Sequence, residues 1–329
     1  PLPAAQRAAL EAALATAFID ERSGAPLATH AVVVVRGGRL LAERYSAGTD
    51  AQKPLLGWSM TKSVMATLLG RMIFLGRAAG VAEPVLAREW SAPDDPRRAI
   101  TLEHLLRMTS GLEFLADYEV PWSDSLRMLF VAEHAAAYAA DKPLVHPPGT
   151  RWSYSDGSTN LLARWIQERA GATLAEQLAF ARRELFAPLG MSTAVISVDA
   201  GGTWVGSSLM QASARDWARL GLLYAQDGRW GEQRLLPDGW VDFVAAPTAG
   251  NAARSYGAGV WRYDAELLRD GDGHPVPAEL GSTFYFAGHD QQFVWIDRAR
   301  RIVIVRLGLA DERFAPATFA ARLVRLLSE

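Results

Sequence analysis

A long stretch with few strand signals separates two strand-rich parts of the chain, and this order limits the folds open to it. From residue 76 to 200 the spacing of apolar residues favours helices, one of which is expected to begin at a threonine cap, Thr101. Strand patterns precede this stretch and follow it. A block of helices inserted into an antiparallel sheet is typical of the α+β class.

The flanking parts have their own pattern. Residues 3–20 and 315–327 are expected to form amphipathic helices, and residues 31–35 and 40–45 a hairpin around Gly37 and Gly38. Later strands are predicted at 256–261, 284–287, 292–297 and 302–307. We therefore expect an antiparallel sheet flanked by N- and C-terminal helices. Residues 1–75 and 201–329 would form the sheet subdomain and residues 76–200 a mainly helical one, with the active site between them.

A serine and a lysine stand three residues apart at the start of the apolar helix expected at 57–73. Residues at i and i+3 share a helix face, so the Lys62 amine can reach the Ser59 hydroxyl. This helix is apolar nearly all round, which indicates burial. Because burial lowers the pKa of a lysine from about 10.4, we expect Lys62 to act as a base for a nucleophilic Ser59.

The choice of basic residues supports this interpretation. The chain has three lysines, Lys53, Lys62 and Lys142, among 34 basic residues, so its other positive charges are arginines. Lysine can give up a proton at useful pH and arginine cannot. The segment around Ser59 also lacks the second glycine of the nucleophile elbow, the usual alternative for a hydrolytic serine.

Composition excludes several other classes of function. A net charge of -2 offers no basic field for nucleic acid, and the absence of cysteine removes disulfides, thiol nucleophiles and cysteine-ligated zinc. The six histidines show no metal-ligand spacing, so we expect neither a metal nor another cofactor. Half of the 329 residues are hydrophobic, enough for a large core.

The sequence does not identify a compartment or an oligomeric state. No apolar run approaches the roughly 18 residues needed to span a bilayer, and no charged-then-apolar leader is present. The chain begins at Pro1, so export with a leader removed and a cytoplasmic location both stay open.

Three separated motifs resemble those of the serine β-lactamase and penicillin-binding-protein superfamily. They are Ser59-Met60-Thr61-Lys62, Tyr154-Ser155-Asp156 at the place of the Tyr-x-Asn loop, and Gly288-His289-Asp290-Gln291-Gln292 at the place of the Lys-Thr-Gly strand. Within the superfamily, the chain is most similar to the class C β-lactamase-like esterases and amidases, which include the 6-aminohexanoate-dimer hydrolases. The resemblance runs from about residue 31 to 308 and implies a β-lactamase/transpeptidase-like fold.

The resemblance also implies catalytic roles. Ser59 would attack an ester or amide carbonyl to form an acyl-enzyme, which water then hydrolyses. Lys62 would be the base and Tyr154 the proton relay to the leaving group, although which of the two takes the first proton stays open. The oxyanion would lie between the main-chain amides of Ser59 and Gln292.

The substrate-binding residues implied by the resemblance are Asp156, His289 and Tyr118. Asp156 replaces an asparagine and adds an anion, while His289-Asp290-Gln291 replaces Lys-Thr-Gly and removes a cation. Both changes disfavour an anionic β-lactam. Tyr118 matches a tyrosine of a substrate-covering loop. Four tryptophans near the motifs are candidates for an apolar acyl pocket: Trp58, Trp122, Trp152 and Trp204.

We therefore expect a serine hydrolase that cleaves ester or amide bonds of small, mostly neutral substrates. The enzymatic alternative is an active β-lactamase or D-amino-acid peptidase. An alternative of another class is a catalytically silent penicillin-recognising sensor domain, against which the joint presence of Ser59, Lys62 and Tyr154 argues.

Overall fold

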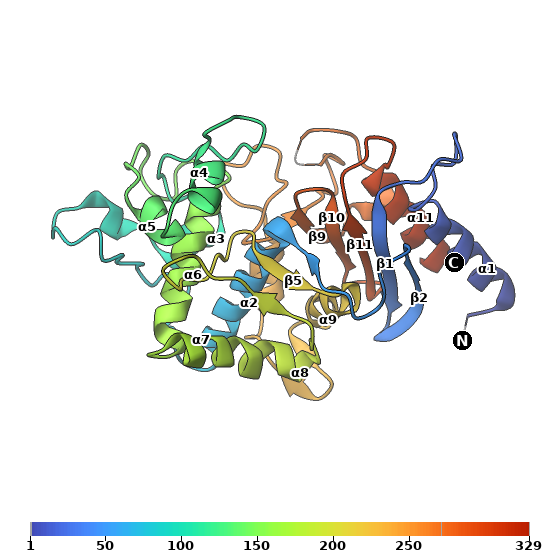
Figure 1. The fold of residues 1–329 in the computed structure, drawn as a ribbon, viewed down its shortest axis with the longest axis horizontal. Coiled ribbons are helices and arrows are strands. Elements are labelled where there is room, and N and C mark those ends of the chain that lie inside the picture. Colours follow the sequence, from blue (N-terminus) through green and yellow to red (C-terminus); the bar gives the residue numbers. More distant parts are fainter. Residues whose placement is uncertain (1, 271, 329) are drawn as a thin grey trace.

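The structure is a computed structural model that describes residues 2–270 and 272–328. A six-stranded antiparallel sheet has the strand order β2-β1-β11-β10-β9-β8 (Figure 1). The strands are β1 (Thr29–Arg36), β2 (Arg39–Tyr45), β8 (Trp261–Arg262), β9 (Phe284–Gly288), β10 (Gln292–Asp297) and β11 (Ile302–Gly308).

Helices cover both faces of this sheet. Helices α1 (Ala4–Ala15) and α11 (Pro316–Ser328) lie against one face, and α9 (Ala214–Ala225) lies against the other (Figure 1). Alternate residues of a strand point to opposite faces, so Val32 and Val34 pack with α1 and α11 whereas Val33 and Val35 pack on the α9 side. Burial of both faces explains why the run 31–35 has no polar alternation.

Helix α2 (Thr61–Phe74) lies between the sheet and a second group of helices (Figure 1). Every residue from Thr61 to Met72 is buried, as the apolar pattern predicted. The second group and its connections comprise η2 (Pro96–Ala99), α3 (Leu102–Leu106), α4 (Asp124–Phe130), α5 (Ala135–Ala140), α6 (Asp156–Ala170), α7 (Leu174–Ala181), the π-helix η3 (Arg182–Phe186) and α8 (Ala187–Leu189). Helix α10 (Trp240–Ala245) and the short helix η4 (Ala278–Leu280) follow α9.

Two smaller sheets complete the fold. One has the order β3-β5-β4, with β3 (Leu55–Leu56), β5 (Met210–Ala212) and β4 (Val195–Ile196), and the other pairs β6 (Arg229–Trp230) with β7 (Gln233–Arg234). The first joins a strand from each of the segments 1–75, 76–200 and 201–329. The subdomain bounds proposed from the sequence stay a prediction, because this sheet crosses them.

The α+β class expected from the sequence is confirmed. The hairpin at 31–45 forms, with φ of 57° at Gly37 and 79° at Gly38, the left-handed values that glycine adopts freely. Thr101 caps α3 as predicted, and the Thr101 amide donates a hydrogen bond to Nδ1 of the His104 ring. The strand predicted at 256–261 is wrong. Gly259 has a φ of 79° and lies in a turn, and the strand β8 begins only after this turn, at Trp261.

None of the helices within residues 2–270 and 272–328 is long and apolar enough to cross a membrane.

Candidate active site

Ser59 lies in a 3-10 turn, η1 (Trp58–Met60), that leads directly into α2. The amide of Gly57 donates to the Met210 carbonyl at 2.9 Å, and the Met210 amide donates to Thr61 Oγ1 at 3.2 Å. Strand β5 therefore holds the turn from both sides. Trp58, just before the serine, has a φ of 48°, and a side-chain-bearing residue in this region is strained. Such strain is common beside functional groups.

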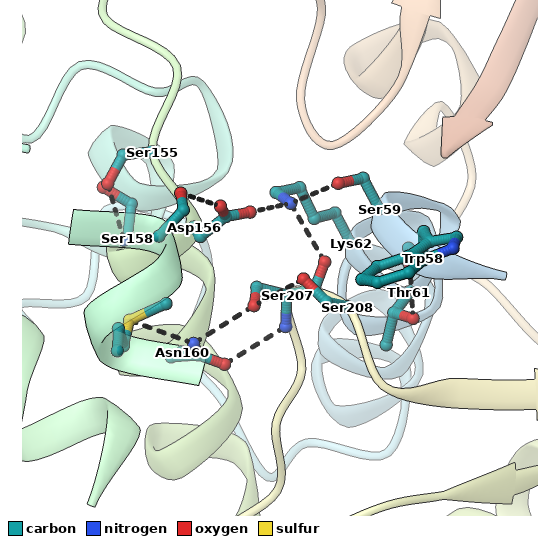
Figure 2. A network of polar contacts seen from close by, with 12 residues as sticks. Trp58, Ser59, Thr61, Lys62, Ser155, Asp156, Ser158, Asn160, Ser207 and Ser208 are labelled. Atoms are coloured by element: carbon teal, nitrogen blue, oxygen red, sulfur yellow. Dashed lines mark hydrogen bonds and ion pairs between the residues drawn. The ribbon is translucent and has the colours of Figure 1, made fainter. Parts of the chain in front are cut away.

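Lys62 is the centre of the polar contacts around Ser59. Its Nζ donates to Ser59 Oγ at 2.9 Å and to the Ser207 carbonyl at 2.9 Å, and it forms an ion pair with Asp156 Oδ1 at 2.5 Å (Figure 2). An ammonium group has three donors, so these contacts use all of them. The side chain is 2% exposed. The reach from Lys62 to Ser59 that the spacing predicted is therefore present.

The predicted direction of the Lys62 pKa is wrong. Burial alone would lower the pKa, but the negative charge of Asp156, with smaller contributions from Tyr154 and Tyr118, outweighs it and raises the pKa above its ordinary value. The sequence argument included the apolar helix around Lys62 but not the carboxylate, which lies 94 residues away along the chain. Lys62 is a cation in this arrangement.

Asp156 lies against Lys62 at the first turn of α6. The carboxylate is completely buried; it accepts hydrogen bonds from Ser125 Oγ and, at 3.4 Å, from the Tyr118 hydroxyl. The N-terminus of a helix favours a negative charge, and Ser155 caps this one by accepting from the Ser158 amide at 3.0 Å (Figure 2). With these partners the carboxylate faces Lys62 and presents no exposed surface to a substrate.

Aromatic rings line the region around Ser59. The Tyr154 ring lies with its centroid 4.9 Å from Lys62 Nζ, within cation-π range, and packs on Trp261. The Tyr118 ring stacks on His289 at 5.0 Å, and Trp58 meets His289 edge-on at 5.2 Å. Burial, and then the charge of Asp156, raises the pKa of Tyr118, so its hydroxyl stays a donor.

The four tryptophans singled out from the sequence have different surroundings. Trp58 belongs to the ring cluster with Tyr118 and His289, and Trp152 packs against Trp261 beside Tyr154. Trp122 is 73% exposed, whereas Trp204 is fully buried in the core. An apolar wall can therefore come from the first two.

Strand β9 packs closely against the serine turn, the segment from Gly57 to Met60 that carries Ser59. A Cβ on Gly288 would lie 2.2 Å from the Gly57 carbonyl oxygen, so only glycine fits there. Gln292 pairs with Gly288 from β10, and its side chain donates to the Gly308 carbonyl and accepts from the Gly308 amide. That side chain ties β10 to β11, and the proposed oxyanion role of its main-chain amide stays a prediction.

Two contacts of the site were not predicted. Ser125 donates to Asp156 from α4, and the sequence predicted only that helices dominate the stretch 76–200 that contains it. The main-chain carbonyl of Ser207 accepts a hydrogen bond from Lys62. Because any residue could supply this carbonyl, the contact cannot be predicted from the residue type. Both contacts join segments far apart in the chain.

The acidic and histidine residues close enough together to hold a metal ion, among those the structure describes, are Asp270, Asp272 and His274. They lie on a loop between β8 and β9 and are partly or fully exposed. None of them belongs to the contacts around Ser59.

The comparisons with known proteins identify the family of the chain. The Beta-lactamase family model matches residues 16–328. The 6-aminohexanoate-dimer hydrolase of Paenarthrobacter ureafaciens is 31% identical over 249 residues, which make up 71% of this chain and 62% of that relative. The aligned part therefore spans less than two thirds of the relative's own length.

Solved structures show the same fold. A candidate 6-aminohexanoate-dimer hydrolase from Bacillus anthracis superposes with a TM-score of 0.74 at 22% identity, over 94% of this chain and 85% of that chain. EstCE1, described as a hydrolase with promiscuous acyltransferase activity, superposes with a TM-score of 0.69 at 16% identity, over 99% of both chains. The resemblance inferred from the three motifs is thus confirmed, and the chain belongs to the Beta-lactamase family of hydrolases.

Proposed function

We propose that this protein is a serine hydrolase that cleaves ester or amide bonds of small, mostly neutral substrates through an acyl-enzyme on Ser59. The observation that carries the proposal is the 2.9 Å contact between Ser59 Oγ and Lys62 Nζ at the start of a buried helix. A hydroxyl within hydrogen-bond reach of an amine, which is oriented in turn by a third group, is the arrangement of an activated nucleophile. Here Asp156 is the third group.

The raised pKa of Lys62 bears on the order of proton transfers. An ammonium group cannot accept the Ser59 proton, so we assign the first acceptance to the phenolate form of Tyr154, whose ring lies beside Lys62. Before the transfer, Lys62 would orient Ser59 Oγ and stabilise the negative charge on the tyrosine oxygen, which becomes a neutral hydroxyl when it takes the proton. Tyr154 would afterwards return the proton to the leaving group.

The oxyanion would be bound by main-chain amides. The Ser59 amide belongs to the first turn of a helix, where amides have no partner within the helix and the dipole favours negative charge. Gln292 was the second donor expected from the sequence. Because Gly288 of β9 is the residue packed on Gly57, we propose the end of β9, at Gly288 and His289, as a second candidate position.

The surroundings favour neutral substrates. Residues 284–292 contain no lysine or arginine. The rings of Trp58, Tyr118 and His289 pack together and offer an aromatic wall. Lys62 and Asp156 form an ion pair with each other, so neither charge is available to a substrate. An anionic β-lactam would thus lack a fixed cation at this strand, and we place the β-lactamase activity second.

The test is hydrolysis of p-nitrophenyl acetate and butyrate by the protein and by Ser59→Ala, with the exposed Ser192→Ala as matched control and nitrocefin in parallel. We expect ester turnover that is lost in Ser59→Ala, is kept in Ser192→Ala, and exceeds nitrocefin turnover. The 6-aminohexanoate dimer is added as an amide substrate, because the P. ureafaciens relative bears that name.

Each other outcome has a defined meaning. Dominant nitrocefin turnover would favour the β-lactamase alternative. Ester activity that survives in Ser59→Ala would contradict the nucleophile assignment. Failure of Ser59 to react with a fluorophosphonate probe, together with no turnover of any substrate, would favour the silent penicillin-recognising protein.

A further inference from the structure

The turn between β9 and β10 has an unfavourable backbone conformation beside the candidate active site. Asp290 has a φ of 60° and Gln291 a φ of 58°, so two consecutive residues with side chains occupy the left-handed region. Glycine adopts this region readily and aspartate tolerates it, but glutamine does so rarely. A turn of this kind persists only where its surroundings hold it.

A buried arginine holds this turn. Arg306 on β11 donates from Nη1 to the carbonyl oxygens of Asp290 at 3.1 Å and Gln291 at 2.9 Å. Its other nitrogens donate to the Leu309 carbonyl at 2.8 Å and to Thr29 Oγ1 at 3.1 Å. The fork of a guanidinium group suits this, because it can hold several acceptors in one fixed geometry.

The environment of Arg306 is unusual for a charged side chain. It is 0% exposed, and within residues 2–270 and 272–328 no carboxylate oxygen lies within 4 Å of its guanidinium nitrogens. Burial lowers the pKa of Arg306 to about 10, so the group still carries its charge near neutral pH. Buried charges are normally paired with an opposite charge. Here neutral carbonyl and hydroxyl oxygens make the direct contacts, while the charges of Asp311 and Asp290 act from farther away and offset only part of the cost of burial. Two of the contacting oxygens belong to the strained turn.

The residues just before the turn contact the segment that carries Ser59. Gly288 packs on the Gly57 carbonyl so tightly that a Cβ would not fit, and His289 meets the Trp58 ring edge-on and stacks on Tyr118. Ser59 follows Trp58 directly. A shift of the turn would therefore move one wall of the candidate active site.

We propose that Arg306 is a positioning residue for the hydrolase site: by holding the carbonyls of Asp290 and Gln291, it keeps Gly288 and His289 against the Ser59 turn. This inference rests on the proposed function of Ser59. It assigns Arg306 no contact with substrate, and it explains why a costly buried charge lies behind this turn.

The test is a double-mutant cycle between the arginine and the turn. Arg306→Met should slow the labelling of Ser59 by a fluorophosphonate probe at least tenfold in the folded protein. The paired substitutions Asp290→Gly and Gln291→Gly remove the backbone strain, so in that background the same Arg306→Met change should slow labelling less than threefold. Arg306→Lys keeps a charge but not the fork, and should fall between the wild type and Arg306→Met.

A second readout separates positioning from general destabilisation. The His289 ring resonances, shifted by stacking on Tyr118, should move toward solvent-exposed values in Arg306→Met and return in the glycine background. Arg164 of α6, a buried arginine paired with Glu89, provides the matched control. Arg164→Met should leave the His289 resonances unchanged. Any effect of Arg164→Met on the labelling of Ser59 should be the same with and without the substitutions Asp290→Gly and Gln291→Gly.

The outcomes are distinct. An unchanged labelling rate in folded Arg306→Met, or an equal loss with and without the glycine pair, would overturn the inference. If Arg306→Met does not fold alone, folding and labelling restored by the glycine pair would support the inference, and Arg306→Lys with wild-type labelling would overturn it. Wild type and Ser59→Ala are labelled alongside. Their difference tests the proposed function independently of Arg306.

Discussion

The buried pair of Asp156 and Lys62 sets the charge next to Ser59, the proposed nucleophile. Lys62 has a raised pKa because the carboxylate outweighs burial, so the lysine stays charged below and around its ordinary value of 10.5 and loses its proton only above that. The stability that the pair contributes is therefore fully present below pH 10.5 and is lost as the pH rises through the higher pKa of the folded state. A wild-type pH profile should carry no Lys62 ionisation between pH 5 and 10.

We predict that Asp156→Asn introduces an ionisation of Lys62 into the pH profile. Without the carboxylate, burial outweighs the smaller contributions of Tyr154 and Tyr118 and the Lys62 pKa falls below its ordinary value, so kcat/KM should gain an ionisation in the neutral to alkaline range. The measurement is the pH dependence of p-nitrophenyl butyrate hydrolysis. Asp124→Asn, which breaks the Lys142 pair elsewhere, is the matched control and should leave the profile unchanged. The same profile in wild type and Asp156→Asn would contradict the assigned charge of Lys62.

The residues found from the sequence and those missed differ in the range of their contacts. Ser59 and Lys62 are three apart, so helix geometry alone predicts their contact. Asp156 was named from its motif, but its contact with Lys62 spans 94 residues and reverses the expected pKa shift. Local spacing therefore predicted the contact between Ser59 and Lys62, whereas the direction of the Lys62 pKa shift depended on a tertiary contact.

At the scale of elements, β9 packs closely against the turn that carries Ser59. We predict that Gly288→Ala slows fluorophosphonate labelling at least tenfold and destabilises the fold by about 1–3 kcal/mol, the usual cost of overpacking. The reason is that the new Cβ would lie 2.2 Å from the Gly57 carbonyl oxygen, a backbone atom that cannot turn aside. Urea denaturation and labelling kinetics measure the two effects.

Gly281→Ala is the control for this change. Its Cβ would meet Ala265 Cα at 3.2 Å, a contact that a shift of a few tenths of an ångström relieves, and it lies outside the serine turn. We expect a small loss of stability and an unchanged labelling rate. Wild-type labelling in Gly288→Ala would show that β9 does not need this close approach.

Elements were predictable where their signals are local. The glycine pair at 37–38 predicted the first hairpin, and the apolar repeats predicted α2 and α11 to within a few residues. The β-rich pattern at 256–261 failed because the left-handed Gly259 outweighs the strand propensity of its neighbours. The strained turn at 290–291 was not foreseeable either, since its support comes from Arg306 on another strand.

At the scale of the whole molecule, one hydrophobic cluster joins the sheet to the helical group. It contains Val33 and Val305 of the sheet, Leu68 of α2, and Leu161 and Ile166 of α6. The candidate active-site residues come from two elements of this core, with Ser59 just before α2, Lys62 in its first turn and Asp156 at the start of α6 (Figure 2). A continuous core predicts that the two parts unfold together, although a chain of this length often unfolds in steps.

We predict that Leu161→Ala lowers stability by about 2–5 kcal/mol, because it opens a cavity at a side chain that is 1% exposed. The loss should appear equally in the slowest-exchanging amides of α6 and of β11, since both report the same global opening. Hydrogen exchange measured by mass spectrometry tests this, with the 43% exposed Leu267→Ala as a control expected to change stability by less than about 0.5 kcal/mol. If only α6 lost protection, the helical group would unfold independently, and the candidate active site would open without loss of the sheet.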